Sequence, residues 1–199
     1  MKKIYYIKIN DDISGMDAIS LVDYPAVGYN FLKFDKDEPI ELKFNDEQHI
    51  ITGVVCLADT PIYRYTEGLG EWYCVFTKDV IKQMIVKYSK ENLWNKINLQ
   101  HDDDKFVDGV YMLESYIKDE SRGVVPAEFK DVPDGSWIAS FYVQNDELWD
   151  EIKKDNGLNG FSLQGHFDLA PSKESFNDEH EDEDELDEQF NEFLKRVLG

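Results

Sequence analysis

The stretch Trp137–Val143 reads WIASFYV, a run of mostly apolar and aromatic residues between Gly135 and Asn145. A short run of this kind, bounded by turn-forming residues, is typical of a buried β-strand. Similar runs recur through the first 170 residues, so the chain is predicted to be mainly β. The other strands are expected at Lys3–Ile9, Ala18–Asp23, His49–Leu57, Trp72–Phe76, Lys96–Gln100, Gly109–Lys118 and Phe161–Leu169.

Two helices are expected to interrupt these strands. Thr77 can cap the first helix, whose apolar stripe follows a helical repeat. Asn145 can cap the second, which stops near Gly157. The apolar residues are Val80, Ile81, Met84, Ile85 and Tyr88 in the first helix, and Leu148, Trp149 and Ile152 in the second. Many strands with few helices predict a mainly β (α+β) fold, a small β-barrel or a rolled sheet.

Charge divides the chain into three parts. Residues 1–170 form the predicted folded domain, and residues 171–185 are dominated by acids that resist compaction, which predicts a disordered linker. Residues 186–199 place Leu186, Phe190 and Val197 on one face of a C-terminal amphipathic helix. This helix is expected to dock on its own domain or on a partner.

The overall composition excludes several classes of protein. Lys and Arg total 21 against 42 Asp and Glu, giving a net charge of -21 that opposes binding to nucleic acid or anionic membranes. No apolar run is long enough for a membrane span or has the form of a signal peptide, so the protein is expected to stay where it is made. Cys56 and Cys74 lack metal-binding spacing and are interpreted as reduced core thiols.

Common catalytic motifs are absent from the sequence. The segment Gly160–Gly165 is one residue too long for a G-x-S-x-G nucleophile elbow, and no phosphate loop, dinucleotide fingerprint or H-E-x-x-H motif occurs. The acids after His101 do not fit a calcium loop, because Asp108 stands where the turn glycine belongs. No cofactor and no metal ion are expected.

Two residues nevertheless stand where chemistry is feasible. His101 closes an apolar strand just before a polar loop, a place where a rigid sheet can present a side chain to a cleft. Ser162 lies between Gly160 and Gly165, which allow a substrate backbone to approach and leave amides free for an oxyanion. Taken alone, each residue is more often structural, so the pair is suggestive only.

An ordered set of blocks resembles the XkdF-like family of phage serine proteases, over most of residues 15–168. The blocks are Ile19–Ala26, Gln100–Asp102, Gly109–Tyr116, Gly135–Trp137, Glu147–Lys154 and Asn159–Gly165. This family is similar to the prohead proteases that share a fold with herpesvirus assemblins. In many of those, a segment like Ile19–Ala26 follows the serine block, so this chain resembles a circular permutation of them.

The resemblance implies a serine endopeptidase with His101 as general base and Ser162 as nucleophile. It leaves the third catalytic residue open between Glu114 and Asp17, since Ala18 occupies the best-aligned position. Asp17 could act only if a bulge turns it inward. A simple hairpin would leave Glu114 roughly 20 Å from His101 at about 3.3 Å per residue. His166 shares a face with Ser162 but lies too far along the strand, about 13 Å, to serve.

The implied role is processing of phage scaffold and major capsid proteins, and of the chain itself, inside an assembling prohead in the host cytoplasm. A homo-oligomer is compatible with this role. One alternative is a catalytically inactive capsid-assembly or scaffold-linked module with the same fold, which Gln164 and the unclear third residue favour. A weaker alternative is a metal-assisted hydrolase that uses His101, Asp102 and His166, whose spacing matches no known ligand set.

Overall fold

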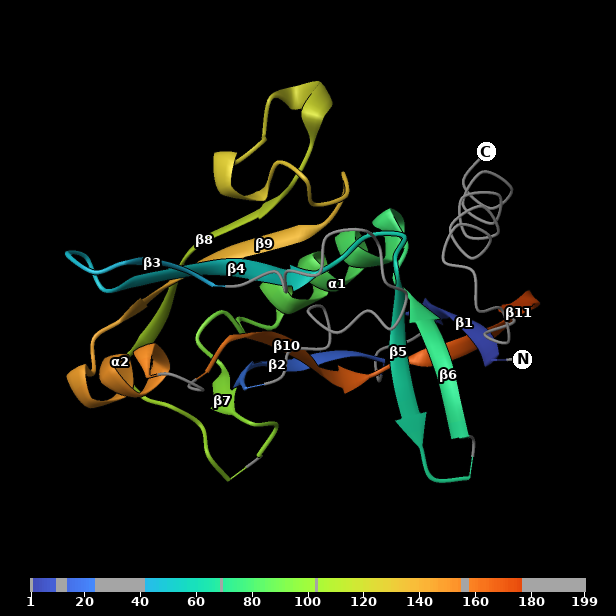
Figure 1. Cartoon of the computed structure of the whole chain (residues 1–199), viewed down its shortest axis with the longest axis horizontal. Coiled ribbons are helices and arrows are strands. Elements are labelled where there is room, and N and C mark those ends of the chain that lie inside the picture. Colours follow the sequence, from blue (N-terminus) through green and yellow to red (C-terminus); the bar gives the residue numbers. More distant parts are fainter. Residues whose placement is uncertain are drawn as a thin grey trace.

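The computed structural model describes residues 2–9, 14–23, 42–68, 70–102, 104–154 and 158–176, which form three open β-sheets and two α-helices (Figure 1). The first sheet has the order β11-β1-β6-β5, the second β10-β2-β7 and the third β3-β4-β9-β8. None of these sheets closes on itself. The mainly β fold is therefore confirmed, and its form is a set of open sheets instead of a closed barrel.

The strands of each sheet come from distant parts of the chain. The first sheet contains β1 (Lys2–Lys8), β5 (Pro61–Thr66), β6 (Gly70–Val75) and β11 (Asp168–Phe176). The second contains β2 (Gly15–Val22), β7 (Ile97–Leu99) and β10 (Gly160–His166). The third contains β3 (Lys43–Asn45), β4 (Ile50–Cys56), β8 (Val110–Ile117) and β9 (Trp137–Val143).

The predicted strands are present with small shifts at their ends, and three details differ. The predicted strand Phe161–Leu169 is two strands in two different sheets, because the chain leaves β10 at Phe167 and enters β11. The strand β5 was not predicted; it opens with Pro61 and lies at a sheet edge, where a missing N–H is tolerated. The strand β3, which is only three residues long, was not predicted either.

The boundary predicted at residue 170 falls inside a strand. β11 continues to Phe176 and pairs with β1, for example through Tyr5 and Pro171. These residues are ordered by main-chain pairing along the side of β1 that β6 leaves open. The rest of the predicted acidic linker and the predicted helix 186–199 lie outside the described residues.

Both predicted helices are present with their predicted caps. The helix α1 (Lys78–Lys90) begins after Thr77, whose Oγ1 accepts a hydrogen bond from the Val80 amide at 3.3 Å. The helix α2 (Asp146–Lys153) begins after Asn145, whose Oδ1 accepts from the Leu148 amide at 2.9 Å. Among the described residues, no helix is long and apolar enough to cross a membrane.

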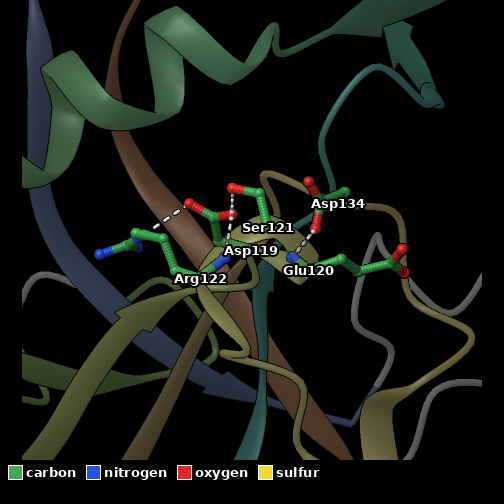
Figure 2. A network of polar contacts seen from close by, with 5 residues as sticks. All are labelled: Asp119, Glu120, Ser121, Arg122 and Asp134. Atoms are coloured by element: carbon green, nitrogen blue, oxygen red, sulfur yellow. Dashed lines mark hydrogen bonds and ion pairs between the residues drawn. The ribbon is translucent and has the colours of Figure 1, made fainter.

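The long connection between β8 and β9 contains the short 3₁₀ helices η2 (Glu120–Arg122) and η3 (Ala127–Phe129). Figure 2 shows how polar contacts organise its first turn. Asp119 accepts hydrogen bonds from the Ser121 hydroxyl at 2.6 Å and from Arg122 Nε at 2.5 Å. These two contacts lower the pKa of Asp119 to about 2. Asp134 accepts from the Glu120 amide at 2.8 Å and so ties the turn to the far end of the connection.

Close packing between the second and third sheets fixes the orientation of β10. The Phe161 ring lies against Phe141 with a centroid separation of 4.9 Å. Gly53 of β4 makes this approach feasible, because a Cβ there would lie 3.0 Å from the Phe161 ring and 2.5 Å from Leu42 Cδ2. With Phe161 buried on this side, its neighbour Ser162 must point to the opposite face of β10.

Candidate active site

The second sheet gathers small polar side chains on one face. Ser20 of β2 is the register partner of Ser162 on β10 and of Asn98 on β7. Register partners project to the same side of a sheet, and residues two apart on a strand share a face. Gln164 therefore lies on the face of Ser162. Large apolar residues, Ile19, Leu21 and Phe161 among them, fill the opposite face and belong to the core.

A tight turn after β7 carries His101 onto this polar face. Gln100 and His101 both have positive φ values, 56° and 58°, and the Asp102 amide donates to the Leu99 carbonyl at 3.0 Å. Two successive positive φ values define a type I′ turn, an uncommon conformation for residues other than glycine. The Gln100 amide donates to the Leu21 carbonyl at 3.0 Å, which fastens the turn to β2.

His101 is held by a hydrogen-bonded network on that face. The Nδ1 atom of His101 lies 2.9 Å from Ser20 Oγ. The Ser20 hydroxyl donates to Gln164 Oε1 at 3.5 Å, and the Asn98 side-chain amide donates to the same oxygen. Ser20 and Asn98 are both fully buried. The side chains of Ser20, Gln164 and Asn98 thus connect all three strands of the second sheet to the imidazole.

Ser162 occupies a different position from Ser20. It lies on β10, an edge strand of the second sheet, and its exposed fraction is 8%, against 0% for Ser20 on the central strand. Ser162 lines a cavity of about 10 Å³ with Cys56, Arg64 and Phe76, close to the room that one water molecule needs. Among the described residues, no hydrogen bond joins Ser162 to His101.

The electrostatic environment favours a neutral imidazole at His101. Burial lowers the pKa of His101 below its usual range, and the positive charge of Arg64 lowers it further. Arg64 also donates through Nη1 to the Tyr63 carbonyl at 3.0 Å, which helps to fix its guanidinium. A neutral imidazole has a free lone pair, which a general base requires.

The two carboxylates predicted as third catalytic residues lie elsewhere. The register between β10 and β2 shifts at Gln164 and Gly165, so β2 has a bulge at Asp17, but the bulge does not turn this residue inward. The bulge directs the Asp17 carboxylate to His166 Nδ1, at 3.0 Å, on the exposed surface. Glu114 is on β8 of the third sheet and accepts from the Ser140 hydroxyl at 2.6 Å. Within the part of the chain that the structure describes, neither carboxylate hydrogen-bonds to His101.

Sequence reasoning missed Ser20, Asn98 and Arg64 and gave Gln164 no role in the site. A usable signal was nevertheless present, because three buried strands each carry one polar residue between two large apolar ones. These triplets are Ile19-Ser20-Leu21, Ile97-Asn98-Leu99 and Phe161-Ser162-Leu163. Burying a polar side chain is costly unless it finds a partner, so such triplets indicate polar groups that meet in the folded protein.

Comparison with known proteins decides the family. Residues 38–171, more than half of the chain, match the family described as "Putative phage serine protease XkdF". The chain belongs to this family. The XkdF match covers His101, Ser162 and Glu114 and begins after Asp17 and Ser20. The relation to herpesvirus assemblins and the circular permutation stay predictions. No curated protein and no solved structure matches the chain.

The described residues contain no cluster of three or more His, Cys, Asp or Glu side chains that could hold a metal ion. Of the three residues considered for a metal site, His166 is paired with Asp17, and Asp102 forms an ion pair with Lys105 at 2.8 Å. His101 instead contacts Ser20. His101 thus contacts one hydroxyl, that of Ser20, and a second hydroxyl, that of Ser162, lies on the same face of the sheet. Imidazole and hydroxyl groups are the side chains that acyl transfer uses.

Proposed function

We propose that this XkdF-family chain is a serine endopeptidase in which Ser162 is the nucleophile and His101 the general base. The observation that carries the proposal is the pairing of Ser162 with Ser20, the residue that holds His101. Side chains of register partners on an antiparallel pair have Cβ atoms about 4.5–5.5 Å apart. The imidazole fixed on Ser20 therefore lies on the same face of the sheet as Ser162, next to the adjacent strand.

Accessibility supports Ser162 over Ser20 as the nucleophile. A peptide bond must reach the attacking oxygen, and Ser20 is fully buried on the central strand of its sheet. Ser162 is on the edge strand, is 8% exposed and lines a cavity of about 10 Å³ with Arg64 and Phe76, so neighbouring side chains must move to admit a peptide. Apo active sites often show long or misaligned hydrogen bonds that tighten only with substrate bound, so the missing Ser162–His101 bond is compatible with activity.

The proposed reaction is acyl transfer in two steps. Ser162 Oγ attacks the scissile carbonyl carbon while its proton passes to His101 Nε2. The carbon–nitrogen bond then breaks, and His101 returns the proton to the leaving amine. Water hydrolyses the acyl-enzyme with His101 again acting as the base, which releases the new carboxylate and restores Ser162.

Two groups near Ser162 are suited to the oxyanion of the tetrahedral intermediate. The first is the backbone amides between Leu163 and Gly165, which follow the nucleophile directly in sequence. The second is the Arg64 guanidinium, which lines the same cavity as Ser162. A positive charge preorganised in a nearly enclosed space stabilises developing negative charge more strongly than it would in water.

The proposed biological role is maturation of a phage prohead. The substrates would be the scaffold and major capsid proteins, together with this chain, and the reaction would take place inside the assembling shell in the host cytoplasm. Association into a homo-oligomer is compatible with this role. Removal of acidic segments by self-cleavage would lower the negative charge that opposes DNA packaging.

A second candidate function is an inactive capsid-assembly module of the same fold. It is favoured by the observation that the His101 imidazole contacts Ser20 and not Ser162 among the described residues. In this interpretation the polar face is a buried network that stabilises the second sheet. The two functions differ in whether Ser162 reacts.

Intact-mass spectrometry of the full chain, alone and with its cognate scaffold and major capsid proteins, tests the proposal. Wild type should produce truncated products that vanish in Ser162→Ala. The matched control is Ser140→Ala, another buried strand serine (1% exposed) that bonds to Glu114 and should leave cleavage intact. Intact proteins in every mixture, with the fold retained and both partners present, would favour the assembly module.

A further inference from the structure

We propose that Ser20 is the positioning residue for the general base, so that the site is a Ser162–His101–Ser20 arrangement with no carboxylate on the imidazole. This inference rests on the proposed function. The contact that carries it is the 2.9 Å separation of Ser20 Oγ and His101 Nδ1, together with the network that fixes the Ser20 hydroxyl.

The direction of the hydrogen bonds follows from the number of protons available. We assign the single hydroxyl proton of Ser20 to Gln164 Oε1, 3.5 Å away, because that oxygen is an acceptor under either tautomer of His101. Ser20 Oγ can then only accept from His101, and the Nδ1 atom must carry the ring proton. A neutral imidazole protonated at Nδ1 has its lone pair on Nε2. Ser20 thereby selects the tautomer in which Nε2 is free to take the Ser162 proton.

Asn98 holds the amide of Gln164 in the orientation in which Oε1 faces the Ser20 hydroxyl. Its side-chain NH₂ group donates to Gln164 Oε1, the same oxygen that accepts from Ser20. Turning the Gln164 amide over would place two NH₂ groups against each other, which removes a hydrogen bond from the buried Asn98. With the Asn98 amide in this orientation, the contacts from Asn98 through Gln164 to Ser20 run in one direction. Turning over both amides would reverse them, and the tautomer of His101 distinguishes the two networks.

The fold provides room for this network on the central strand. Asn98 is on β7 and Gln164 is on β10, so their contact crosses β2 on the face of Ser20. The register partner of Gln164 is Ala18, whose small, fully buried side chain leaves space above the strand for the amide. Among the described residues, no carboxylate hydrogen-bonds to His101. A neutral hydroxyl avoids burying a negative charge, which would be costly and would raise the pKa of the imidazole.

The first test observes the tautomer directly and needs no activity. Long-range ¹H–¹⁵N correlation spectra of the His101 ring are recorded on Ser162→Ala protein, in which self-cleavage cannot interfere. The pH is kept above the pKa of His101, so that the ring is neutral. The expected state is protonated at Nδ1. Adding Ser20→Ala, or Gln164→Met, which removes the acceptor for the Ser20 proton, should shift the population toward protonation at Nε2. The Ser140→Ala control should leave the ring signals unchanged.

The second test measures the reactivity of Ser162 with a fluorophosphonate probe, which labels an activated serine without needing the natural substrate. The labelling rate, followed by intact mass and located by peptide mapping, should fall roughly 10- to 100-fold in Ser20→Ala, because orienting residues contribute less than the nucleophile or the base. The Ser140→Ala rate should stay within about 3-fold of wild type. Circular dichroism and the ring signals establish that each variant is folded.

The outcomes separate the two proposals. Labelling at Ser20, an Nε2-protonated ring in the parent protein, or an unchanged tautomer in both Ser20→Ala and Gln164→Met would overturn the assignment of Ser20. A larger loss of labelling in Asp17→Asn or Glu114→Gln than in Ser20→Ala would also overturn it, in favour of that carboxylate. If no serine is labelled in any variant while the tautomer shifts as expected, the positioning role stands and the protease function fails.

Discussion

Ser20 Oγ lies 2.9 Å from His101 Nδ1, although 81 residues separate them in the chain. Ser20 is on the central strand of the second sheet, while His101 extends from the turn after its neighbour β7. Ser162 is on the strand at the opposite side of Ser20. The proposed base contacts β2 through Ser20, and the proposed nucleophile is on the strand that pairs with β2 at the same residue. Substitutions that disturb β2 or its neighbours are therefore expected to change the rate of cleavage.

Arg64 is expected to shift the acidic limit of activity to lower pH. Burial and then Arg64 lower the pKa of His101, and only the neutral ring can act as a base, so activity should fall as pH drops through this lowered pKa. In Arg64→Met the pKa rises, and the acidic limb of kcat/KM moves to higher pH. Arg64→Lys keeps a positive charge and should move the limb less. Identical limbs in wild type and Arg64→Met would show that Arg64 does not act on His101.

The lowered pKa of His101 is also expected to make the folded protein less stable at acidic pH. The folded protein holds a proton at His101 less tightly than the unfolded chain, whose histidine has the ordinary pKa of 6.5. Unfolding therefore takes up a proton once the pH falls below that value, and the free energy of unfolding should decrease there. His101→Gln removes this contribution, so urea midpoints measured across the acidic range should show a weaker pH dependence in the variant.

The two cysteines are expected to be inert, although Cys56 lines the same cavity as Ser162. Burial raises the pKa of both thiols, and the nearby Cys74 raises that of Cys56 further. Iodoacetamide reacts with thiolates, so the folded protein should be alkylated at neither position and should keep its activity. Both should react in concentrated guanidinium chloride. Rapid alkylation of the folded chain with loss of cleavage would implicate a thiol in the mechanism.

Gly165 is expected to be essential for the pairing of β10 with β2. A Cβ at this position would lie 2.1 Å from the Gly15 carbonyl oxygen and 2.8 Å from Met16 Cα, both backbone atoms at the bulge. Gly165→Ala should lower the free energy of unfolding by roughly 3 kcal/mol or more and reduce labelling of Ser162. Urea denaturation measures the first effect.

The matched control for this change is Gly123→Asn. Gly123 has a φ of +73°, which asparagine tolerates, and a Cβ at this position would meet no atom within 4 Å. The unfolding free energy of Gly123→Asn should stay within about 1 kcal/mol of wild type. Equal losses in the two variants would indicate that the close approach at Gly165 has no special energetic weight.

Lys118 is a buried cation that forms an ion pair with Glu120. Its side chain is 2% exposed, and its Nζ lies 2.9 Å from Glu120 Oε1. Glu120→Gln removes the countercharge and should cost about 1–3 kcal/mol of unfolding free energy, while Lys118→Met should cost less because no charge remains buried. Chemical denaturation of both variants gives the comparison.

An exposed ion pair provides the reference for that measurement. Lys153 and Asp46 lie 2.5 Å apart with side chains 39% and 64% exposed. Asp46→Asn should change the unfolding free energy by at most about 1 kcal/mol, since solvent screens exposed pairs. If Glu120→Gln costs no more than Asp46→Asn, burial of Lys118 does not make its pairing important.

The amino-acid sequence by itself determined the local structure of this protein. The apolar run Trp137–Val143, the caps Thr77 and Asn145, and the stripes of both helices are properties of neighbouring residues, and the structure confirms each of them. The ordered family blocks likewise drew attention to His101 and Ser162, both within the matched range 38–171. Short-range periodicity and capping carry this information because they depend on few residues.

Only the tertiary structure decided which polar groups meet. The triplet Ile19-Ser20-Leu21 indicates a polar residue inside a buried strand. The register partners of Ser20 are Asn98 and Ser162, 78 and 142 residues away in the chain, and the order of strands in the sheet brings them together. The bulge at Asp17 was conceivable from sequence, whereas its direction toward His166 depended on the register between β2 and β10. Strand pairing depends on how whole faces of the sheets pack, which no short stretch of sequence specifies. For this reason Ser20, and not one of the predicted carboxylates, contacts His101.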